Sequence, residues 1–229
     1  MKLLKLTVVF LFINIPVVLF AQVGLNISGG GNMSKINAID RSNYAVATIY
    51  KPGFQVGVSA DIPLGQRTLF YPGISFVIKG YKAKNAVGTT TLNPYFLEVP
   101  LSILYQAGIG NGNLLIGAGP YFSYGLGGKW KFNRANTADS TVYVTSGPVE
   151  FVNDYTTRKG GNVIPYGRPI DVGGNVILGY ERNRYKILLD GQLGLINLEP
   201  YQDGVRPIYA NQQTIGIKLQ FVYNLLTIN

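Results

Sequence analysis

Apolar residues recur at every second position in eight segments of this chain. In one of them, Phe54, Val56 and Val58 alternate with Gln55 and Ser59. Successive side chains of a β-strand point to opposite faces, so this spacing places one apolar and one polar or small face on a single strand. The chain is therefore predicted to be all-β. The expected strands cover residues 23–27, 54–62, 70–78, 95–105, 114–124, 172–180, 187–195 and 215–223.

The composition agrees with a glycine-rich β-protein and excludes several kinds of enzyme. Charged residues make up 14% of the chain, against about 25% in a typical soluble domain, and 29 of the 229 residues are glycine. The chain has no cysteine and no histidine, which excludes thiolate chemistry, catalytic triads with histidine and imidazole–metal sites. We predict no catalytic, cofactor-binding or metal-ligating residue, no cofactor, and no nucleic-acid partner.

The first residues are typical of a signal peptide. Lys2 and Lys5 precede the apolar segment 6–20, and Ala21 offers a small residue for cleavage. The alternative, a membrane anchor helix, is less well supported because about 15 apolar residues fall short of the roughly 20 needed to span a bilayer. We therefore expect a signal peptide over 1–21 and one β-barrel domain over 22–229.

Short and long connections alternate along the chain. Residues 63–68, 108–113 and 182–184 form tight turns between predicted strands, whereas the other connections are longer. Transmembrane barrels have short periplasmic turns, longer extracellular loops and an even number of strands. The pattern predicts an eight-stranded antiparallel up-and-down transmembrane β-barrel with long extracellular loops.

A soluble eight-stranded barrel of the lipocalin type is the competing fold. Its outer face would need many charges, yet the predicted strands carry few. Aromatic residues also gather near both ends of the strands, as expected of girdles at the two membrane interfaces. Those near the short turns are Phe70, Tyr105, Tyr180, Tyr185, Phe221 and Tyr223, and those near the long loops are Phe54, Tyr81, Tyr95, Tyr124 and Trp130.

The second face of the strands is rich in small polar residues and carries a few charges that would lie in the lumen. The candidate lumen network comprises Lys79, Glu98, Asp171, Glu181, Lys186, Asp190 and Lys218. Paired carboxylates for acid–base catalysis are the alternative, but buried charges need partners and the lysines supply them. Because an eight-stranded interior is filled by side chains, a plugged lumen is favoured over a pore.

The long loops are the most promising functional surface because most of the net positive charge falls in them. The candidate interaction residues are Lys129, Lys131, Arg134, Arg158, Lys159 and Arg168. Residues 141–145 and 149–152 alternate around a turn at 146–148, which predicts a hairpin above the barrel. Such a rim could bind lipopolysaccharide phosphates, acidic glycans or an envelope protein partner, and a solvated rim without a ligand is an equally open alternative.

The order of short motifs resembles the PorT-type outer-membrane β-barrel family. The motifs are residues 23–28, 51–58, 79–82, 97–101, 117–121 and 194–197. The chain departs from the family at Gly73, where an acidic residue is common, at 190–192, where an arginine is common, and at 224–229, which follow the expected terminal aromatic residue. The resemblance implies a location in the cell outer membrane, no known catalysis and, for some relatives, an accessory part in a protein-secretion and gliding apparatus.

These observations lead to one functional hypothesis with one main alternative. The chain is expected to be a non-enzymatic outer-membrane β-barrel protein, in contact with outer-membrane lipid, with a structural or interaction role that includes envelope protein secretion as an accessory. A small-solute pore is the alternative. An enzyme comes third.

Overall fold

The computed structural model describes residues 23–85, 87–135, 142–157 and 162–228. The signal peptide predicted over 1–21 lies outside these residues. Apart from η2 (Tyr155–Thr157), a short 3-10 helix, the regular structure of the described residues is β-strand, so the all-β class is confirmed. The described part of the chain contains no helix long and apolar enough to cross a membrane.

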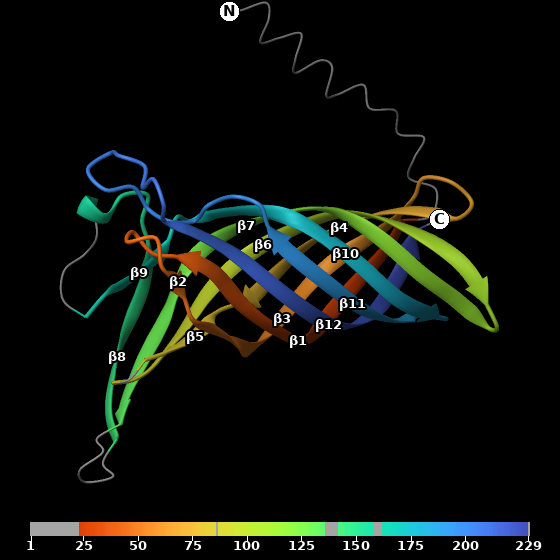
Figure 1. Cartoon of the computed structure of the whole chain (residues 1–229). Helices are drawn as coiled ribbons and strands as arrows, with labels where there is room; N and C mark the ends of the chain where they lie inside the picture. Colours follow the sequence, from red (N-terminus) through yellow and green to blue (C-terminus); the bar gives the residue numbers. More distant parts are fainter. Residues whose placement is uncertain (1–22, 86, 136–141, 158–161, 229) are drawn as a thin grey trace, which may run out of the picture.

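The strands form one 12-stranded sheet that is rolled into a barrel (Figure 1). Eight strands build the wall: β1 (Val23–Ile39), β3 (Thr48–Pro63), β4 (Thr68–Ile78), β6 (Gly88–Ile109), β7 (Gly112–Ala135), β10 (Ile170–Arg182), β11 (Tyr185–Gly194) and β12 (Asn211–Ile228). Four more lie in connections that were predicted to be loops: β2 (Ala45–Val46), β5 (Tyr81–Lys84), β8 (Val142–Phe151) and β9 (Ile164–Gly167). The structure thus has more strands than the eight that the sequence predicts.

Antiparallel pairing runs around the wall and returns to its first strand. β1 pairs with β3, and the pairs β3–β4, β4–β6, β6–β7, β7–β10, β10–β11 and β11–β12 follow. β12 pairs in turn with β1 along its whole length, from Val23 opposite Ile228 to Ile39 opposite Asn211. Each wall strand therefore has hydrogen-bonded neighbours on both sides, which a strand in lipid requires.

The period-two alternation predicts the two faces of the wall correctly. In β11, Ile187 and Leu189 are exposed on the outside, whereas Lys186, Leu188 and Asp190 are buried in the lumen. The same alternation holds in the other predicted strands. A continuous outer surface of large aliphatic and aromatic side chains would be unfavourable in water, so the wall suits contact with lipid.

The three predicted tight turns are confirmed. They connect β3 to β4, β6 to β7 and β10 to β11 at one end of the barrel. Gly110 and Asn183 adopt the left-handed conformation in the second and third turns, with φ of 58° and 56°. Glycine and asparagine are the residues that tolerate this region in two-residue hairpin turns.

The prediction of a hairpin within residues 141–152 is wrong. The segment from Val142 to Phe151 is a single strand, β8, and Gly147 and Pro148 lie inside it. Its partner is the distal half of β7, with Ala135 opposite Val142 and Gly128 opposite Val149. The long-range ladder with β7 keeps Ser146, Gly147 and Pro148 extended, although their residue types favour a turn.

A β-bulge in β7 reverses the alternation near the loop end of the barrel. The pairing with β6 shifts between Tyr95 and Phe96, which leaves Leu126 as an extra residue in β7. Gly127 follows with φ of 131°, a conformation that suits glycine because it lacks a Cβ. Leu126 points outward, whereas Trp130 is buried inside.

The bulge explains why one predicted girdle residue is misplaced. Trp130 was expected on the outer wall, but it packs in the interior because the parity of β7 changes before it. Tyr81 also packs against the interior, since it has the same parity as the inward Lys79. The other predicted girdle residues are exposed or half-buried on the outside.

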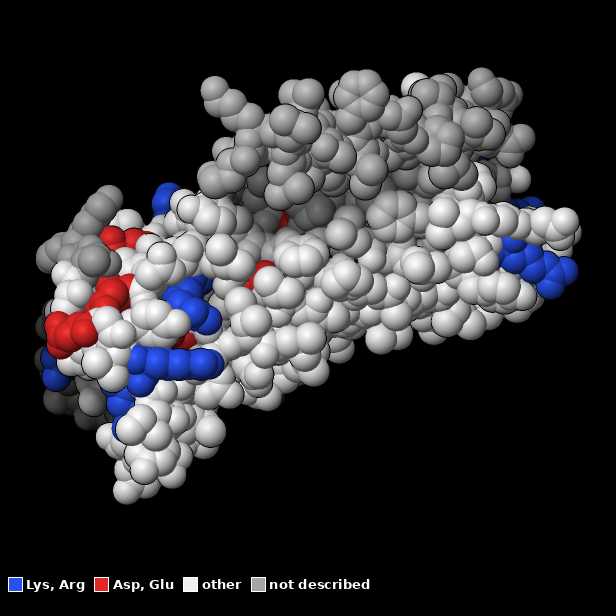
Figure 2. All heavy atoms as spheres, turned by 90° about the horizontal axis from the view of Figure 1, so that it is seen from above, with Lys and Arg blue, Asp and Glu red and all other residues white. Residues whose placement is uncertain are grey.

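Charged side chains gather at the two ends of the molecule. Figure 2 shows lysine and arginine at both ends of the face in view, whereas acidic residues appear at the loop end and in small patches nearer the middle, and the wall between the ends is largely uncharged. Among the described residues, the exposed lysines and arginines lie either in the short turns or at the loop end. The middle of the wall is therefore an apolar belt.

A charge placed on this belt should destabilise the barrel. Replacing the outward Leu189 with arginine near the middle of the wall should reduce the free energy of unfolding by about 2–4 kcal/mol. The same replacement at Leu64, exposed in the β3–β4 turn, should change it by less than about 0.5 kcal/mol. Urea unfolding of protein refolded in lipid vesicles measures both, and equal effects would show that the wall does not face lipid.

Candidate functional site

The lumen is the first candidate site, and its centre is a buried ionic cluster. Glu98 of β6 lies between two lysines, Lys79 before β5 and Lys218 of β12. The Lys79 Nζ is 2.6 Å from Glu98 Oε2, and Lys218 pairs with Oε1. Gln192 Nε2 donates to Oε1 at 2.9 Å and Ser123 Oγ donates to Oε2 at 3.0 Å. Both carboxylate oxygens of Glu98 are thus held by charged and neutral donors.

Two more carboxylates complete the cluster. Asp171 of β10 lies 4.0 Å from the Lys79 ammonium and accepts a hydrogen bond of 3.2 Å from the Tyr121 hydroxyl. Asp190 of β11 lies 4.0 Å from the Lys218 ammonium. The structure therefore brings together five of the seven predicted network residues, with two lysines facing three carboxylates.

The other two predicted network residues form a separate ion pair at the short-turn end. Lys186 lies 3.3 Å from Glu181 Oε1 and 2.5 Å from Asp61 Oδ2. Gln106 Nε2 donates to Glu181 at 2.8 Å. Asp61 was not included in the predicted network, although its position on the inward face of 54–62 is a signal that could have identified it.

Two apolar clusters lie on either side of the central ionic cluster, one between it and the Lys186 ion pair and the other between it and the loop end. β6 crosses all the layers: Gln106 lies at the short-turn end, then come Leu104, Glu98 and Phe96. The lower cluster contains Leu69, Tyr71, Leu104, Leu115, Ile177, Leu188 and Val222. The upper cluster contains Ile36, Leu92, Phe96, Trp130, Val149 and Tyr166. The sequence analysis predicted small polar residues here and missed these large side chains.

Close packing in the upper cluster depends on a glycine. A Cβ on Gly125 would lie 2.4 Å from the Phe151 ring, so only glycine leaves room for that ring. The Phe151 and Phe96 rings meet edge to face at 5.2 Å, and Phe151 also contacts Tyr166 at 5.4 Å. The Trp130 Nε1 donates to the carbonyl of Asn162 at 2.8 Å. Aromatic rings therefore close the loop end of the lumen.

The lumen chemistry is that of charge neutralisation. Each carboxylate of the central cluster lies beside a lysine, and each lysine is buried with it. The described residues contain no group of three or more acidic side chains arranged to hold a metal ion. A buried cluster of this kind holds strands together and specifies their register.

The second candidate site is the loop end. The predicted basic residues do not form one group there. Lys129, Lys131 and Arg134 are exposed on the distal half of β7. Arg168 is half-buried, donates through Nε to the carbonyl of Asn197 at 3.2 Å and lies 5.5 Å from the Tyr201 ring centre. Arg168 therefore braces the loop after β11 and does not belong to the exposed group on β7. Arg158 and Lys159 lie outside the described residues.

Loops that are far apart in sequence are tied together at this end. The Arg41 guanidinium lies 3.3 Å from Glu199 Oε1 and 4.6 Å from the Tyr155 ring centre. Asp154 accepts hydrogen bonds from the backbone amides of Thr156 and Gly204, which lowers the pKa of Asp154 to about 2. The sequence gives no periodic signal for these contacts because each joins two irregular segments.

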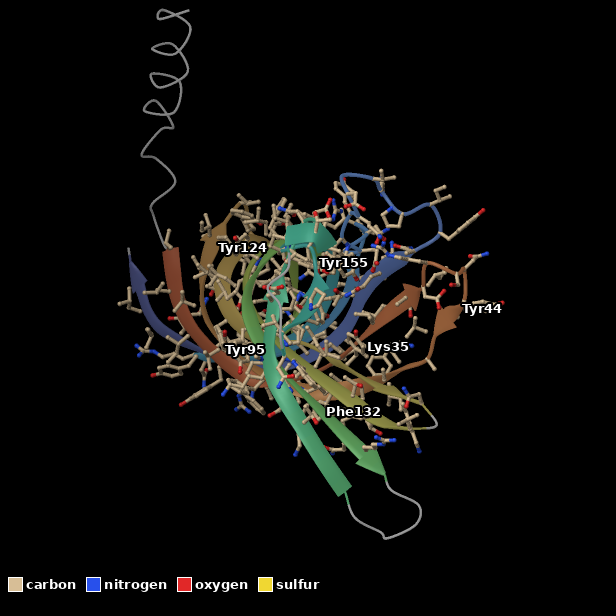
Figure 3. The ribbon with its side chains drawn as sticks, turned by 90° about the vertical axis from the view of Figure 1, so that its left-hand side faces the viewer. Lys35, Tyr44, Tyr95, Tyr124, Phe132 and Tyr155 are labelled. Carbon is tan, nitrogen blue, oxygen red and sulfur yellow. The ribbon has the colours of Figure 1, made fainter. Side chains whose placement is uncertain are left out.

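The loop after β11 also exposes large apolar side chains. Ile208 is 87% exposed, the largest fraction among the exposed apolar residues of the described chain, and Val205 and Tyr209 are exposed beside it. Tyr44 of the β1–β3 connection is exposed at the same end, where Figure 3 also shows Tyr155. These side chains lie beyond the apolar belt, so lipid does not cover them.

The charge balance of the central cluster leads to a prediction about stability. Lys218→Met would leave three carboxylates with one lysine, and breaking a buried pair in this way should cost about 3–5 kcal/mol. Glu98→Gln should cost less, because two lysines would then face two carboxylates. Urea unfolding in vesicles at pH 7 compares them, and a larger loss for Glu98→Gln would contradict this view of the cluster.

The chain is similar to several solved structures at low sequence identity. Ail, the attachment invasion locus protein of Yersinia pestis, in complex with the heparin analogue sucrose octasulfate, shares 10% identity and a TM-score of 0.38, covering 87% of this chain and 99% of that one. The structure of Ail without this ligand shares 9% identity and a TM-score of 0.36, and the match covers 87% of this chain and 98% of that one. The N-terminal β-barrel domain of Pseudomonas aeruginosa OprF shares 13% identity and a TM-score of 0.26, and the match covers 87% of this chain and 97% of that one. Such low TM-scores carry no argument about function.

The family comparison is more informative. No curated protein matches the chain. The family model described as "Outer membrane protein beta-barrel domain" matches residues 19–198, which is well over half of the chain. This match agrees with the rolled sheet, its apolar outer belt and its polar interior. The chain therefore belongs to the outer membrane protein β-barrel domain family, and the protein lies in the outer membrane.

Proposed function

We propose that this protein is a sealed, non-enzymatic eight-stranded transmembrane barrel that acts through contacts made at its loop end. In this proposal β1, β3, β4, β6, β7, β10, β11 and β12 cross the membrane, after removal of a signal peptide over 1–21. The outward uncharged residues of β7 run from Leu114 to Leu126. That is about 40 Å of strand and about 30 Å of depth at a tilt of roughly 40°, which suits a bilayer.

The observation that carries the proposal is the filled lumen. The ionic cluster around Glu98 lies between two apolar clusters, and all three layers consist of buried side chains. An eight-stranded barrel has an interior only wide enough for such side chains. The arrangement favours a structural or interaction role over the small-solute pore that was the alternative.

An interaction role is supported by the surface that projects beyond the apolar belt. Val205, Ile208 and Tyr209 expose apolar area to water, and such area is typical of protein contact sites. Contacts of Arg41 and Asp154 brace the same loop from two other connections. A braced loop presents these side chains with less loss of conformational entropy on binding.

We further propose that the protein is of the PorT type and is an accessory of envelope protein secretion. Support comes from the order of the motifs quoted above, which covers nearly the whole chain after the predicted signal peptide. The family match agrees with the broader assignment to outer-membrane barrels. The partner would then be another protein of the envelope, with outer-membrane lipid around the wall.

Electrical recording separates the sealed barrel from the pore. Purified protein inserted in planar bilayers should give no steady conductance steps, because the central cluster and the two apolar clusters fill the lumen. A barrel of known conductance, prepared in the same detergent, serves as the positive control. Reproducible steps from intact protein that keeps its folded gel mobility would support the pore instead.

Site-specific photo-crosslinking tests the interaction surface. A photoreactive amino acid at Ile208 should form an adduct with another envelope protein in intact cells, because this side chain is exposed beyond the belt. The matched control places it at Leu64, which is similarly apolar but lies in a short turn at the opposite end. Adducts at Leu64 and none at Ile208 would place the contact at the short-turn end and would contradict the proposed interaction surface.

A further inference from the structure

The sheet extends past the barrel wall on one side of the loop end. The distal parts of β6 and β7, together with β5 and β8, run away from the barrel axis and project outside its outline in two perpendicular views (Figures 1 and 3). Phe132 lies on this extension in Figure 3. We call this part of the sheet, residues 81–84, 88–93, 129–135 and 142–148, the flared sheet.

The bulge in β7 decides which side chains lie on each face of the flared sheet. Beyond Gly127, Trp130 and Phe132 pack toward the interior cluster, so Lys129 and Lys131 lie on the outward face. Without the extra residue Leu126, the two lysines would point inward. The outward face is the continuation of the wall surface that carries Tyr124 and Leu126.

The register of the strands brings two more lysines to the same face. Lys82 of β5 is opposite Thr91 of β6, and Thr91 is opposite Lys131 of β7. Neighbouring strands are about 4.8 Å apart, so the Lys82 and Lys131 backbones are about 10 Å apart. Lys84 occupies the next row, opposite Thr89, which is opposite Asn133. The face therefore presents four lysines with hydroxyl and amide groups between them.

No ion pair neutralises these lysines, Lys82, Lys84, Lys129 and Lys131, in the part of the chain that the structure describes. On the same face of β8, Glu150 lies two residues after Pro148, which is opposite Lys129. An anionic ligand would complete the face, and phosphate groups suit lysine and threonine donors.

The direction of the flare indicates where that ligand lies. A wall that bends away from the barrel axis turns its outward face back toward the membrane surface. The same face changes from apolar side chains at Tyr124 and Leu126 to lysines at Lys129 and Lys131 within a few residues. In the proposed span of β7, which ends at Leu126, this change falls where the headgroups begin.

We propose that the outward face of the flared sheet binds the phosphate groups of lipopolysaccharide in the outer leaflet. The proposal rests on the proposed function in one respect, namely that the loop end opens at the cell surface. It adds a lipid contact that differs from the protein contact proposed at Ile208. Binding there holds the flared sheet against the membrane and fixes how the barrel is turned in its plane.

The absence of cysteine from the chain allows a direct test of the orientation of this face. Thr91→Cys places a fluorescent label on the lysine face, and Thr90→Cys is the matched control on the opposite face of the same strand. In vesicles with a nitroxide quencher on the headgroups of both leaflets, the Thr91 label should be quenched at least threefold more than the Thr90 label. Equal quenching of the two labels would overturn the proposal. It is the result expected if the face points to solution and binds an acidic protein.

Charge neutralisation tests the ligand. Vesicles containing lipid A with both phosphates should increase quenching of the Thr91 label over vesicles with dephosphorylated lipid A. The variant K82Q/K84Q/K129Q/K131Q should lose this increase, whereas R67Q/R182Q/R184Q/R206Q, which removes the same charge from other exposed sites, should keep it. Folding of both variants is checked by gel mobility without heating.

The outcomes separate this proposal from the proposed function. An unchanged response in the lysine variant, or equal responses to lipid A with and without its phosphates, would overturn the lipid assignment. Neither result bears on bilayer conductance or on crosslinking at Ile208. Conversely, steady conductance would contradict the sealed barrel, but it would not change the conclusion drawn from the quenching experiment.

Discussion

The pairing of β12 with β1 is the contact on which the rest of the structure depends. In lipid, every backbone amide and carbonyl must find a partner within the protein, and the ladder from Val23–Ile228 to Ile39–Asn211 supplies partners for the two strands that would otherwise be edges. Once the wall is complete, alternation leaves only two environments for side chains. One faces lipid and the other a narrow lumen.

The narrowness of that lumen accounts for its chemistry. Charges there cannot reach bulk water, so Glu98 requires both Lys79 and Lys218, and Lys186 requires Asp61 and Glu181. Apolar side chains can fill the remaining space without partners, which explains why large residues separate the two ionic groups. The buried ion pairs therefore tie together wall strands that are far apart in the sequence.

The parts of the fold that repeat could be predicted, and the parts that depend on one irregular residue could not. Alternation identified the outward Leu189 and the inward Asp190, and five of the residues that it assigned to the lumen lie side by side there. Trp130 was misplaced because a single extra residue in β7, Leu126, reverses the alternation, and periodicity carries no information on such an insertion. The Gly-Leu-Gly-Gly sequence at 125–128 is the only local sign of it.

The same bulge connects the structural and functional ends of the molecule. By turning Trp130 inward it helps to close the lumen, and by turning Lys129 and Lys131 outward it creates a basic face just beyond the apolar belt. A continuous strand with regular alternation would place the lysines against the interior cluster and the indole in the headgroups. Closure of the lumen at the loop end and formation of the basic face are therefore coupled, because both depend on the bulge at Leu126 and Gly127.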